Sequence, residues 1–419
     1  MSTLIKSATI VDSSSPYHQQ KKDILIQDGR IKKIDASIPS KEEYTIVEQE
    51  NLHVSCGWFD TSVSFGEPGY EERETIKNGL QVAAKSGFTA VAVNANTNPV
   101  IDTKSAVEFL IHKAHNSATK LHPIAALTKR SEGIEMAELY DMQQSGAIAF
   151  GDHKKPIAND NLMKISLLYA QNFNGLVLSF PKNNAIAGEG IAHEGVNSTK
   201  LGLKGIPALA EEMQIARDLF LLEYTGGKLH IPTISTAKSV ALIKKAKKRG
   251  LKVSCSVAVH HLILTDDELH AFDSNYKTNP PLRTNADCKA LIKGIKTGVI
   301  DVITSDHNPI DIEHKKVEFS EAKDGTIGLE SFFGALNSVL MVEEFIENIS
   351  SKPRALFGLK TTAIAEGEIA DISLFNPKQI YTFTKEHLLS ASKNSPFVNT
   401  KMNGKVYGIF SNNQLILNS

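Results

Sequence analysis

The chain has 14 histidines and 47 acidic residues among its 419 positions, so side chains that could bind metals or transfer protons are plentiful. Three local groups stand out: His260-His261, His193-Glu194-Gly195 and Asp266-Asp267-Glu268. Adjacent residues on a strand point to opposite faces, so His260 and His261 are not expected to bind one ion together. The other two groups fit a connecting loop and a helix start, so none of the three predicts a metal site.

The elements that must position functional side chains alternate from about residue 57 to residue 359. Short apolar runs such as Ala90–Val93 and Lys252–Val257 are followed by segments with helical periodicity, such as Pro207–Tyr224. About seven or eight such repeats predict a (β/α)₈ barrel. A doubly wound parallel sheet is the alternative, but the chain has neither a GxGxxG nor a GxxxxGK[ST] fingerprint to support it.

Both ends of the chain have the alternating pattern of β-strands. Strands are predicted at Thr3–Val11 and Arg30–Ile34 near the start, and at Asp371–Phe375 and Lys405–Phe410 near the end. We therefore predict two domains: a small β-sandwich from residues 1–56 and 363–419, and a barrel from residues 57–362.

Composition narrows the classes of function. The 46 basic and 47 acidic residues give a net charge of −1, which lacks the electrostatic footprint of a nucleic-acid-binding protein. The three cysteines, Cys56, Cys255 and Cys288, are far apart and odd in number, which argues against a disulfide framework. No apolar run reaches the 18 or more residues of a membrane span. A cytoplasmic protein is predicted, with no nucleic-acid or membrane partner.

Several long segments, in colinear order, resemble the dihydroorotase family of cyclic amidohydrolases. They include SCGWFDTSVSFGEPGYEERETIKNGLQVAAKSGFTAVAVNANTNPVIDT (55–103), KLHIPTISTAKSVALIKKAKKRGLKV (228–253), YKTNPPLRTNADCKALIKGIKTGVIDVITSDHNP (276–309) and EGEIADISLFNP (366–377). The resemblance implies a metal-containing (β/α)₈ barrel of the amidohydrolase kind. It also implies reversible hydrolysis of dihydroorotate to carbamoyl-aspartate, for which zinc supplies a bound hydroxide and a Lewis acid.

This chain departs from the family at the first group of metal ligands. The family's Asp-x-His-x-His corresponds to Asp60-Thr61-Ser62-Val63-Ser64, so hydroxyls at Ser62 and Ser64 replace two imidazoles. A neutral, protonated hydroxyl is a poor zinc ligand. The family arginine that holds the substrate carboxylate corresponds to Gly66, which loses a bidentate contact.

The later ligand positions are also changed. The bridging carboxylate corresponds to His153, and the two remaining ligand histidines correspond to Phe180 and Thr233. Asp306, in Ser305-Asp306-His307-Asn308-Pro309-Ile310, matches the family's ligand and general acid/base, while Ile310 replaces a substrate-binding histidine. Two substrate-amide positions, Asn96 and Asn279, are kept.

Of the six metal positions that the resemblance implies, only Asp306 keeps its residue, with His153 a substituted candidate. Two ligands do not build the three-ligand protein site that catalytic zinc requires. We therefore expect no metal cofactor, a vestigial role for Asp306, and a smaller, drier pocket. A hydrogen-bonded pair of His153 and Asp306 is expected to fill the former metal site.

The leading hypothesis is a catalytically impaired dihydroorotase homologue, a pseudoenzyme that acts as a structural or regulatory subunit with aspartate transcarbamoylase. A homo-oligomer is expected from the resemblance. The alternative is an active dihydroorotase or related cyclic amidohydrolase that uses an atypical site. In that case catalysis would depend on zinc as the cofactor and on Asp306, His153, His307 and the two asparagines.

Overall fold

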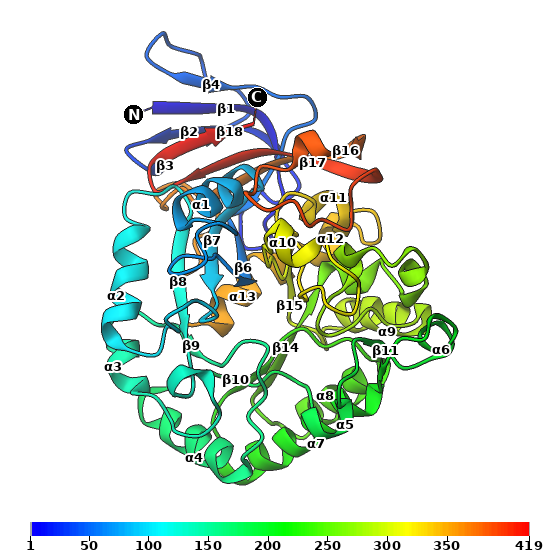
Figure 1. Cartoon of the computed structure of the whole chain (residues 1–419). Helices are drawn as coiled ribbons and strands as arrows, with labels where there is room; N and C mark the ends of the chain where they lie inside the picture. The colour runs from blue at the N-terminus through cyan, green and yellow to red at the C-terminus, as the bar shows by residue number, and fades with distance from the viewer. Residues whose placement is uncertain (1, 419) are drawn as a thin grey trace.

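The computed structural model describes residues 2–418, and its larger part is a closed barrel of parallel strands (Figure 1). The eight strands, in barrel order, are β6 (Trp58–Val63), β7 (Phe88–Val93), β8 (Lys120–Ala125), β9 (Ala149–Phe150), β10 (Val177–Leu178), β13 (Leu229–Ile231), β14 (Val253–Ala258) and β15 (Val302–Thr304). The barrel closes between β15 and β6, where the Ser64 N–H donates to the His307 carbonyl at 2.7 Å beside a parallel bridge. The predicted fold class is confirmed.

Helices surround the barrel on its outside. They are α1 (Ile76–Lys85), α2 (Lys104–Lys113), α3 (Leu139–Gln144), α4 (Asp160–Ala170), α7 (Ala208–Thr225), α8 (Ala237–Lys248), α9 (Asn285–Lys296), α12 (Val342–Ile349) and α13 (Ser351–Leu356). Thr75, Thr103, Asn159, Thr236 and Thr284 start five of them, because each side chain accepts a hydrogen bond from an otherwise unpaired N–H of the first turn. No helix within residues 2–418 is long and apolar enough to cross a membrane.

Shorter elements lie in the connections. Between β10 and α7 the chain forms α5 (Asn184–Ala187), β11 (Ala192–His193), α6 (Val196–Leu201) and β12 (Gly205–Ile206). After β15 it forms α10 (Ile312–Lys315) and α11 (Phe332–Leu336).

Both chain ends build a second, mixed sheet beside the barrel. Its strands are β1 (Ser2–Ile10), β2 (Lys21–Gln27), β3 (Arg30–Asp35), β4 (Thr45–Val47), β5 (His53–Cys56), β16 (Ile372–Phe383), β17 (Thr400–Ser411) and β18 (Gln414–Leu417). Strand β1 has an irregularity between Ile5 and Ala8, so its first half pairs with β4 and its second half with β5. Alternate side chains of these strands form a separate apolar core, as the period-2 pattern predicts.

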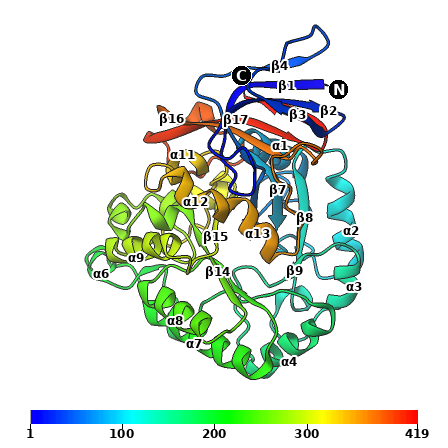
Figure 2. The same cartoon turned by 180° about the vertical axis from the view of Figure 1, so that it is seen from behind.

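Two buried contacts join this sheet to the barrel. The Trp58 ring at the start of β6 stacks on Phe333 at 5.0 Å and lies 5.5 Å from Phe375 of β16. Helix α13 (Figure 2) packs against β6. Its Arg354 donates to Asp371 Oδ2 at 2.9 Å, to Thr89 Oγ1 at 2.7 Å and to the Gly57 carbonyl. The guanidinium thus satisfies partners from both domains.

The structure corrects one local prediction. His260 and His261 do not lie on a strand, because β14 ends at Ala258 and residues Val259–Leu262 form a 3₁₀ turn. Both rings are buried and their centroids are 4.4 Å apart. The opposite-face argument therefore does not apply to them.

Arg354→Met should destabilise the protein strongly. The change leaves the Asp371 carboxylate buried without its cation, for which a loss of about 3–5 kcal/mol is expected. The matched control is Lys352→Met on the same helix, whose ion pair with Glu347 is exposed and is expected to contribute about 1 kcal/mol or less. Chemical unfolding followed by circular dichroism measures both variants, and equal midpoints would contradict the prediction.

Candidate active site

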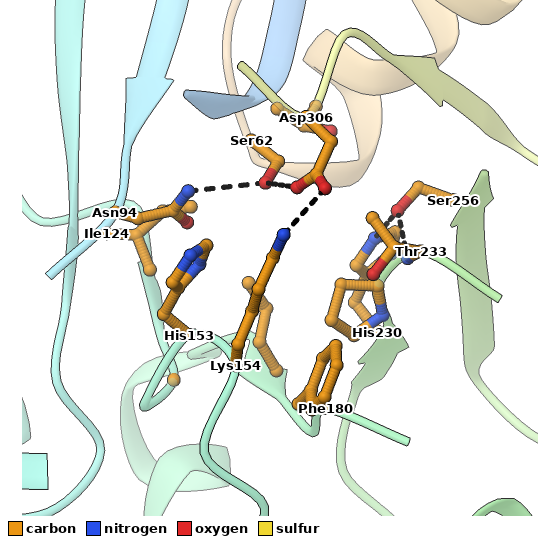
Figure 3. A pocket seen from close by; sticks show the side chains of 14 residues that line it. Ser62, Asn94, Ile124, His153, Lys154, Phe180, His230, Thr233, Ser256 and Asp306 are labelled. Carbon is orange, nitrogen blue, oxygen red and sulfur yellow. Dashed lines mark hydrogen bonds and ion pairs between the residues drawn. The ribbon is translucent and has the colours of Figure 1, made fainter. Parts of the chain in front are cut away.

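The side chains at the carboxyl ends of the barrel strands converge on one small cavity (Figure 3). Its polar lining includes Ser62, Asn94, His153, Lys154, His230, Thr233, Ser256 and Asp306, and its apolar lining includes Ile124, Leu178 and Phe180. The cavity measures about 20 Å³, which is room for about one water molecule. The prediction of a small pocket at this place agrees with this geometry.

The strongest polar contact in the cavity joins Lys154 and Asp306. Lys154 Nζ lies 2.8 Å from Asp306 Oδ2, and the side chains are only 12% and 4% exposed. The other carboxylate oxygen accepts a hydrogen bond from Ser62 Oγ at 3.2 Å. Asp306 therefore has a full-charge partner inside the barrel, supplied by the chain itself.

A local backbone feature explains how Lys154 reaches the cavity. His153 has a φ of 51°, in the left-handed region that residues other than glycine seldom adopt. His153 and Lys154 form a turn beyond the end of β9, where the alternation of side chains in an extended strand no longer applies. His153 and Lys154 consequently both line the cavity (Figure 3). The Asp152 carboxylate holds the turn by accepting hydrogen bonds from the N–H groups of Leu127 and Thr128.

His153 does not form the expected hydrogen-bonded pair with Asp306. Among the described residues its Nε2 atom has no hydrogen-bond partner, and the Asp306 carboxylate accepts from Lys154 and Ser62. Burial, followed by the nearby positive charge of Lys154, lowers the pKa of His153 to about 3. The imidazole is therefore neutral at pH 7, and the expected pair was wrong.

Ser62 and Ser64, at two positions where the resemblance implies metal ligands, belong to a hydrogen-bonded row of neutral groups. Asn94 Nδ2 donates to Ser62 Oγ at 3.2 Å and to Ser64 Oγ at 3.4 Å. Nearby, His230 of β13 contacts the hydroxyls of Ser254 and Ser256 at 2.8 and 3.2 Å. These side chains are thus joined by hydrogen bonds between neutral groups in the barrel interior.

Phe180 and Thr233, at the other two substituted ligand positions, also border the cavity. Thr233 and Asp306 have φ angles of 48° and 50°, so with His153 three of the lining residues are left-handed. Such conformations cost of order 1–3 kcal/mol each and concentrate at functional sites. The backbone at these strand ends has the geometry of a functional site, although the side chains have changed.

The two predicted substrate-amide residues lie elsewhere. Asn96 and Asn279 do not line the central cavity, and Asn279 borders a separate cavity of about 10 Å³ on the other side of Phe180. Their Oδ1 atoms are buried and have no hydrogen-bond partner within residues 2–418. The residue that does enter the site is Asn94, two positions before Asn96, and sequence reasoning missed it together with Lys154.

Asp60, which opens the altered Asp-x-His-x-His motif, supports the backbone. Its carboxylate accepts hydrogen bonds from the N–H groups of Ser62 and Ser305 and from the Thr304 hydroxyl. Burial raises the pKa of Asp60 to about 6, against the lowering effect of these donors. The Asp60 carboxylate thus links the ends of β6 and β15, because its oxygens accept hydrogen bonds from backbone N–H groups of both.

Gly66, at the position of the family arginine, lies in a turn with no space for a side chain. A Cβ atom there would lie 1.8 Å from the Tyr70 carbonyl oxygen, and the Gly66 and Tyr70 backbones are hydrogen-bonded at 2.8 Å. A guanidinium cannot be restored by substitution alone.

The residues of the site do not fit a catalytic zinc ion. Within residues 2–418, no group of three or more His, Cys, Asp or Glu side chains is arranged to hold a metal. Besides the Asp306 carboxylate, the cavity lining has two side chains of the zinc-binding type, the imidazoles of His153 and His230, and His230 is already hydrogen-bonded to Ser254 and Ser256. Too few ligands remain for the three that a catalytic zinc site takes from the protein. The Lys154 ammonium also repels any cation that approaches the carboxylate.

Comparison with known proteins agrees with the resemblance in sequence. Residues 53–239 match the family model described as Dihydro-orotase-like. The dihydroorotase of Trichlorobacter lovleyi is 36% identical over 410 residues, covering 96% of both chains. That of Ruminiclostridium cellulolyticum is 38% identical over 404 residues, covering 95% of this chain and 94% of the relative.

Solved structures share the fold at lower identity. The L-hydantoinase (dihydropyrimidinase) from Arthrobacter aurescens has a TM-score of 0.85 and 19% identity, covering 99% of this chain and 96% of the other. Dihydropyrimidinase from Brevibacillus agri has a TM-score of 0.83 and 20% sequence identity, and the match covers 100% of this chain and 95% of the other. The near-complete match to curated dihydroorotases, on the same barrel-plus-sheet architecture, means that this chain belongs to the dihydroorotase family.

Proposed function

We propose that this chain is a catalytically impaired dihydroorotase homologue of pyrimidine biosynthesis, and that it serves as a structural or regulatory subunit with aspartate transcarbamoylase in the cytoplasm. The observation that carries the proposal is the ion pair between Lys154 and Asp306 in a cavity of about 20 Å³. The family's reaction needs Asp306 free to bind metal and to move a proton. Here an ammonium and a hydroxyl occupy its oxygens.

Space gives independent support. Dihydroorotate is a six-membered ring with a carboxylate, and a cavity that holds about one water molecule does not admit it. The loss of a basic residue at Gly66 removes the contact that would bind the carboxylate. Binding and chemistry are therefore impaired for separate reasons, which agrees with a protein kept for its folded surface.

The purified protein should contain far less than one zinc ion per chain and should not hydrolyse dihydroorotate above the uncatalysed background. The reason is that the donors around Asp306 do not form a zinc site. Inductively coupled plasma mass spectrometry and a spectrophotometric assay, each before and after dialysis against a chelator and zinc, measure the two quantities. Stoichiometric zinc, with turnover that Asp306→Ala abolishes, would instead establish the atypical active enzyme.

The partner part of the proposal has its own test. Mixed with aspartate transcarbamoylase from the same organism, the protein should co-elute in size-exclusion chromatography and raise the thermal stability of that enzyme. Binding stabilises a folded partner by an amount that depends on the ratio of the binding protein's concentration to Kd. The melting temperature, measured while this protein is titrated in, therefore gives the affinity. Separate elution at concentrations of tens of micromolar, with no change in melting temperature, would rule out a stable complex.

Lys154→Met should destabilise the protein by about 3–5 kcal/mol, because it leaves the Asp306 carboxylate buried without a cation. Asp306→Asn should also destabilise it, since Lys154 then lacks its anion. The double variant, Lys154→Met with Asp306→Asn, should recover much of the lost free energy of unfolding, as expected of two groups that interact directly. Lys155→Met is the matched control, because Lys155 is the exposed neighbour of Lys154.

Urea unfolding with and without a chelator measures this set of variants. The wild-type midpoint should not change with the chelator, because the cation at Asp306 is part of the chain. Additive losses in the double variant, or equal effects of the Lys154 and Lys155 changes, would contradict a direct pairing of Lys154 with Asp306.

A further inference from the structure

A separate cavity of about 340 Å³ lies where the barrel meets the sheet of the chain ends. Its walls come from β16 and β17, from α11 and from the end of α1, and β17 contacts both helices (Figure 1). Its lining includes Lys85, Glu330, Tyr381, Phe383, His387 and Lys405, and we name it the hairpin cavity. It shares no lining residue with the central cavity. Small-molecule sites commonly measure about 300–1,000 Å³, so the hairpin cavity has the size of a ligand site.

One wall of the hairpin cavity is aromatic. Tyr381 and Phe383 are two positions apart on β16, so their side chains point to the same face of the strand. The centroid of the His387 ring lies 5.2 Å from that of Tyr381 and 5.5 Å from that of Phe383. Phe383 is buried beneath this wall, whereas Tyr381 is partly exposed and His387 is exposed. The two outer rings therefore offer a surface on which a planar ring can stack.

Glu330 supplies a hydrogen-bond acceptor that the chain leaves unused. Its Oε1 atom accepts hydrogen bonds from the N–H groups of Leu389 and Ser390, at 3.1 and 2.9 Å, and so holds the segment that follows β16. Its Oε2 atom is buried and has no hydrogen-bond partner within residues 2–418. A buried acceptor without a donor is unfavourable. This oxygen is therefore a position that an N–H group of a bound molecule can fill.

Two cations and a hydroxyl lie on the same lining. Lys85 ends α1 and Lys405 belongs to β17, and both side chains are partly exposed. Neither ammonium forms a hydrogen bond or an ion pair with any of residues 2–418. Burial raises the pKa of Tyr381 to about 12, so its phenol is protonated at pH 7 and can donate a hydrogen bond. Ammonium groups without a carboxylate partner, together with a phenol, are suited to bind a phosphate.

The lining as a whole is balanced in charge. The two ammonium groups are matched by the carboxylates of Glu330 and Glu386. A ligand that suits this set carries an anionic group at one end and an N–H donor at the other, with a planar ring for the aromatic wall. A nucleoside monophosphate whose base has an exocyclic amino group has all three parts, and bases stack well on aromatic side chains.

We propose that the hairpin cavity binds a free nucleoside monophosphate with an amino-bearing base. The amino group donates to Glu330 Oε2, and the base stacks on the wall of Tyr381 and His387. Lys85 and Lys405 bind the phosphate. The proposal does not depend on whether the central site is active, because the two cavities have no residue in common.

Isothermal titration calorimetry with the purified full chain, in a buffer without phosphate, tests the ligand class. CMP and AMP should bind at one site per chain with a Kd below about 1 mM. UMP and IMP carry a carbonyl oxygen in place of the amino group, so they should bind at least about tenfold more weakly, because two acceptors would then face each other. Cytidine and adenosine, which lack the phosphate, should also bind more weakly.

Two variants test the assigned contacts. Lys405→Met should weaken CMP binding by about tenfold or more and leave cytidine binding unchanged, because only the phosphate contact is lost. Glu330→Gln keeps an oxygen for the N–H groups of Leu389 and Ser390 but puts an amide N–H₂ at the Oε2 position. The preference for CMP over UMP should therefore disappear or reverse, which a purely structural role of Glu330 would not produce.

Lys401→Met is the matched control, because Lys401 is an exposed lysine of the same strand and does not line the cavity. It should bind CMP like the wild type, and circular dichroism checks that every variant is folded. A Kd above about 10 mM for all four nucleotides would overturn the proposal. Equal binding of CMP and UMP by the wild type, or CMP binding that neither Lys405→Met nor Glu330→Gln alters, would also overturn it.

Discussion

The charge of Asp306 must be balanced inside the barrel, and much of the site's arrangement is organised around this requirement. The carboxylate lies at the end of β15, where parallel strands converge and little water enters. A buried ionised group without a partner costs several kcal/mol. In a metal-dependent relative, metal ions would supply the opposite charge. Here the Lys154 ammonium supplies it at 2.8 Å, and the Ser62 hydroxyl completes the contact.

The Lys154 ammonium also affects the neighbouring positions. Lys154 reaches into the cavity, and the surrounding positions hold small hydroxyls and an aromatic ring. His153 is kept neutral by its burial and by the same ammonium, which lies close to it. Asp60 and Asp152 accept hydrogen bonds from backbone N–H groups at two strand ends, so they hold the loops that carry Lys154 and Asp306. The catalytic end of the barrel is thereby held together by hydrogen bonds and one ion pair.

The prediction from sequence was best where the signal was local and repeated. The alternation of apolar runs and helical segments predicted the barrel, and the period-2 pattern at both ends predicted the accessory sheet. Of the six positions aligned with the family's metal ligands, all but Ser64 line one cavity: Ser62, His153, Phe180, Thr233 and Asp306. The alignment was less successful for Asn96 and Asn279, which lie outside that cavity, and for the proposed pairing of His153 with Asp306.

The sequence by itself determined which metal ligands are missing, because residue type at an aligned position needs no coordinates. Only the tertiary structure decided what replaced them. Lys154 enters the cavity from a turn after β9 in which His153 is left-handed, and such a backbone angle is not encoded by a recognisable pattern of residue types. Likewise, the absence of an arginine at Gly66 is visible in the sequence, whereas the contact with the Tyr70 carbonyl that forbids one depends on how the chain folds back.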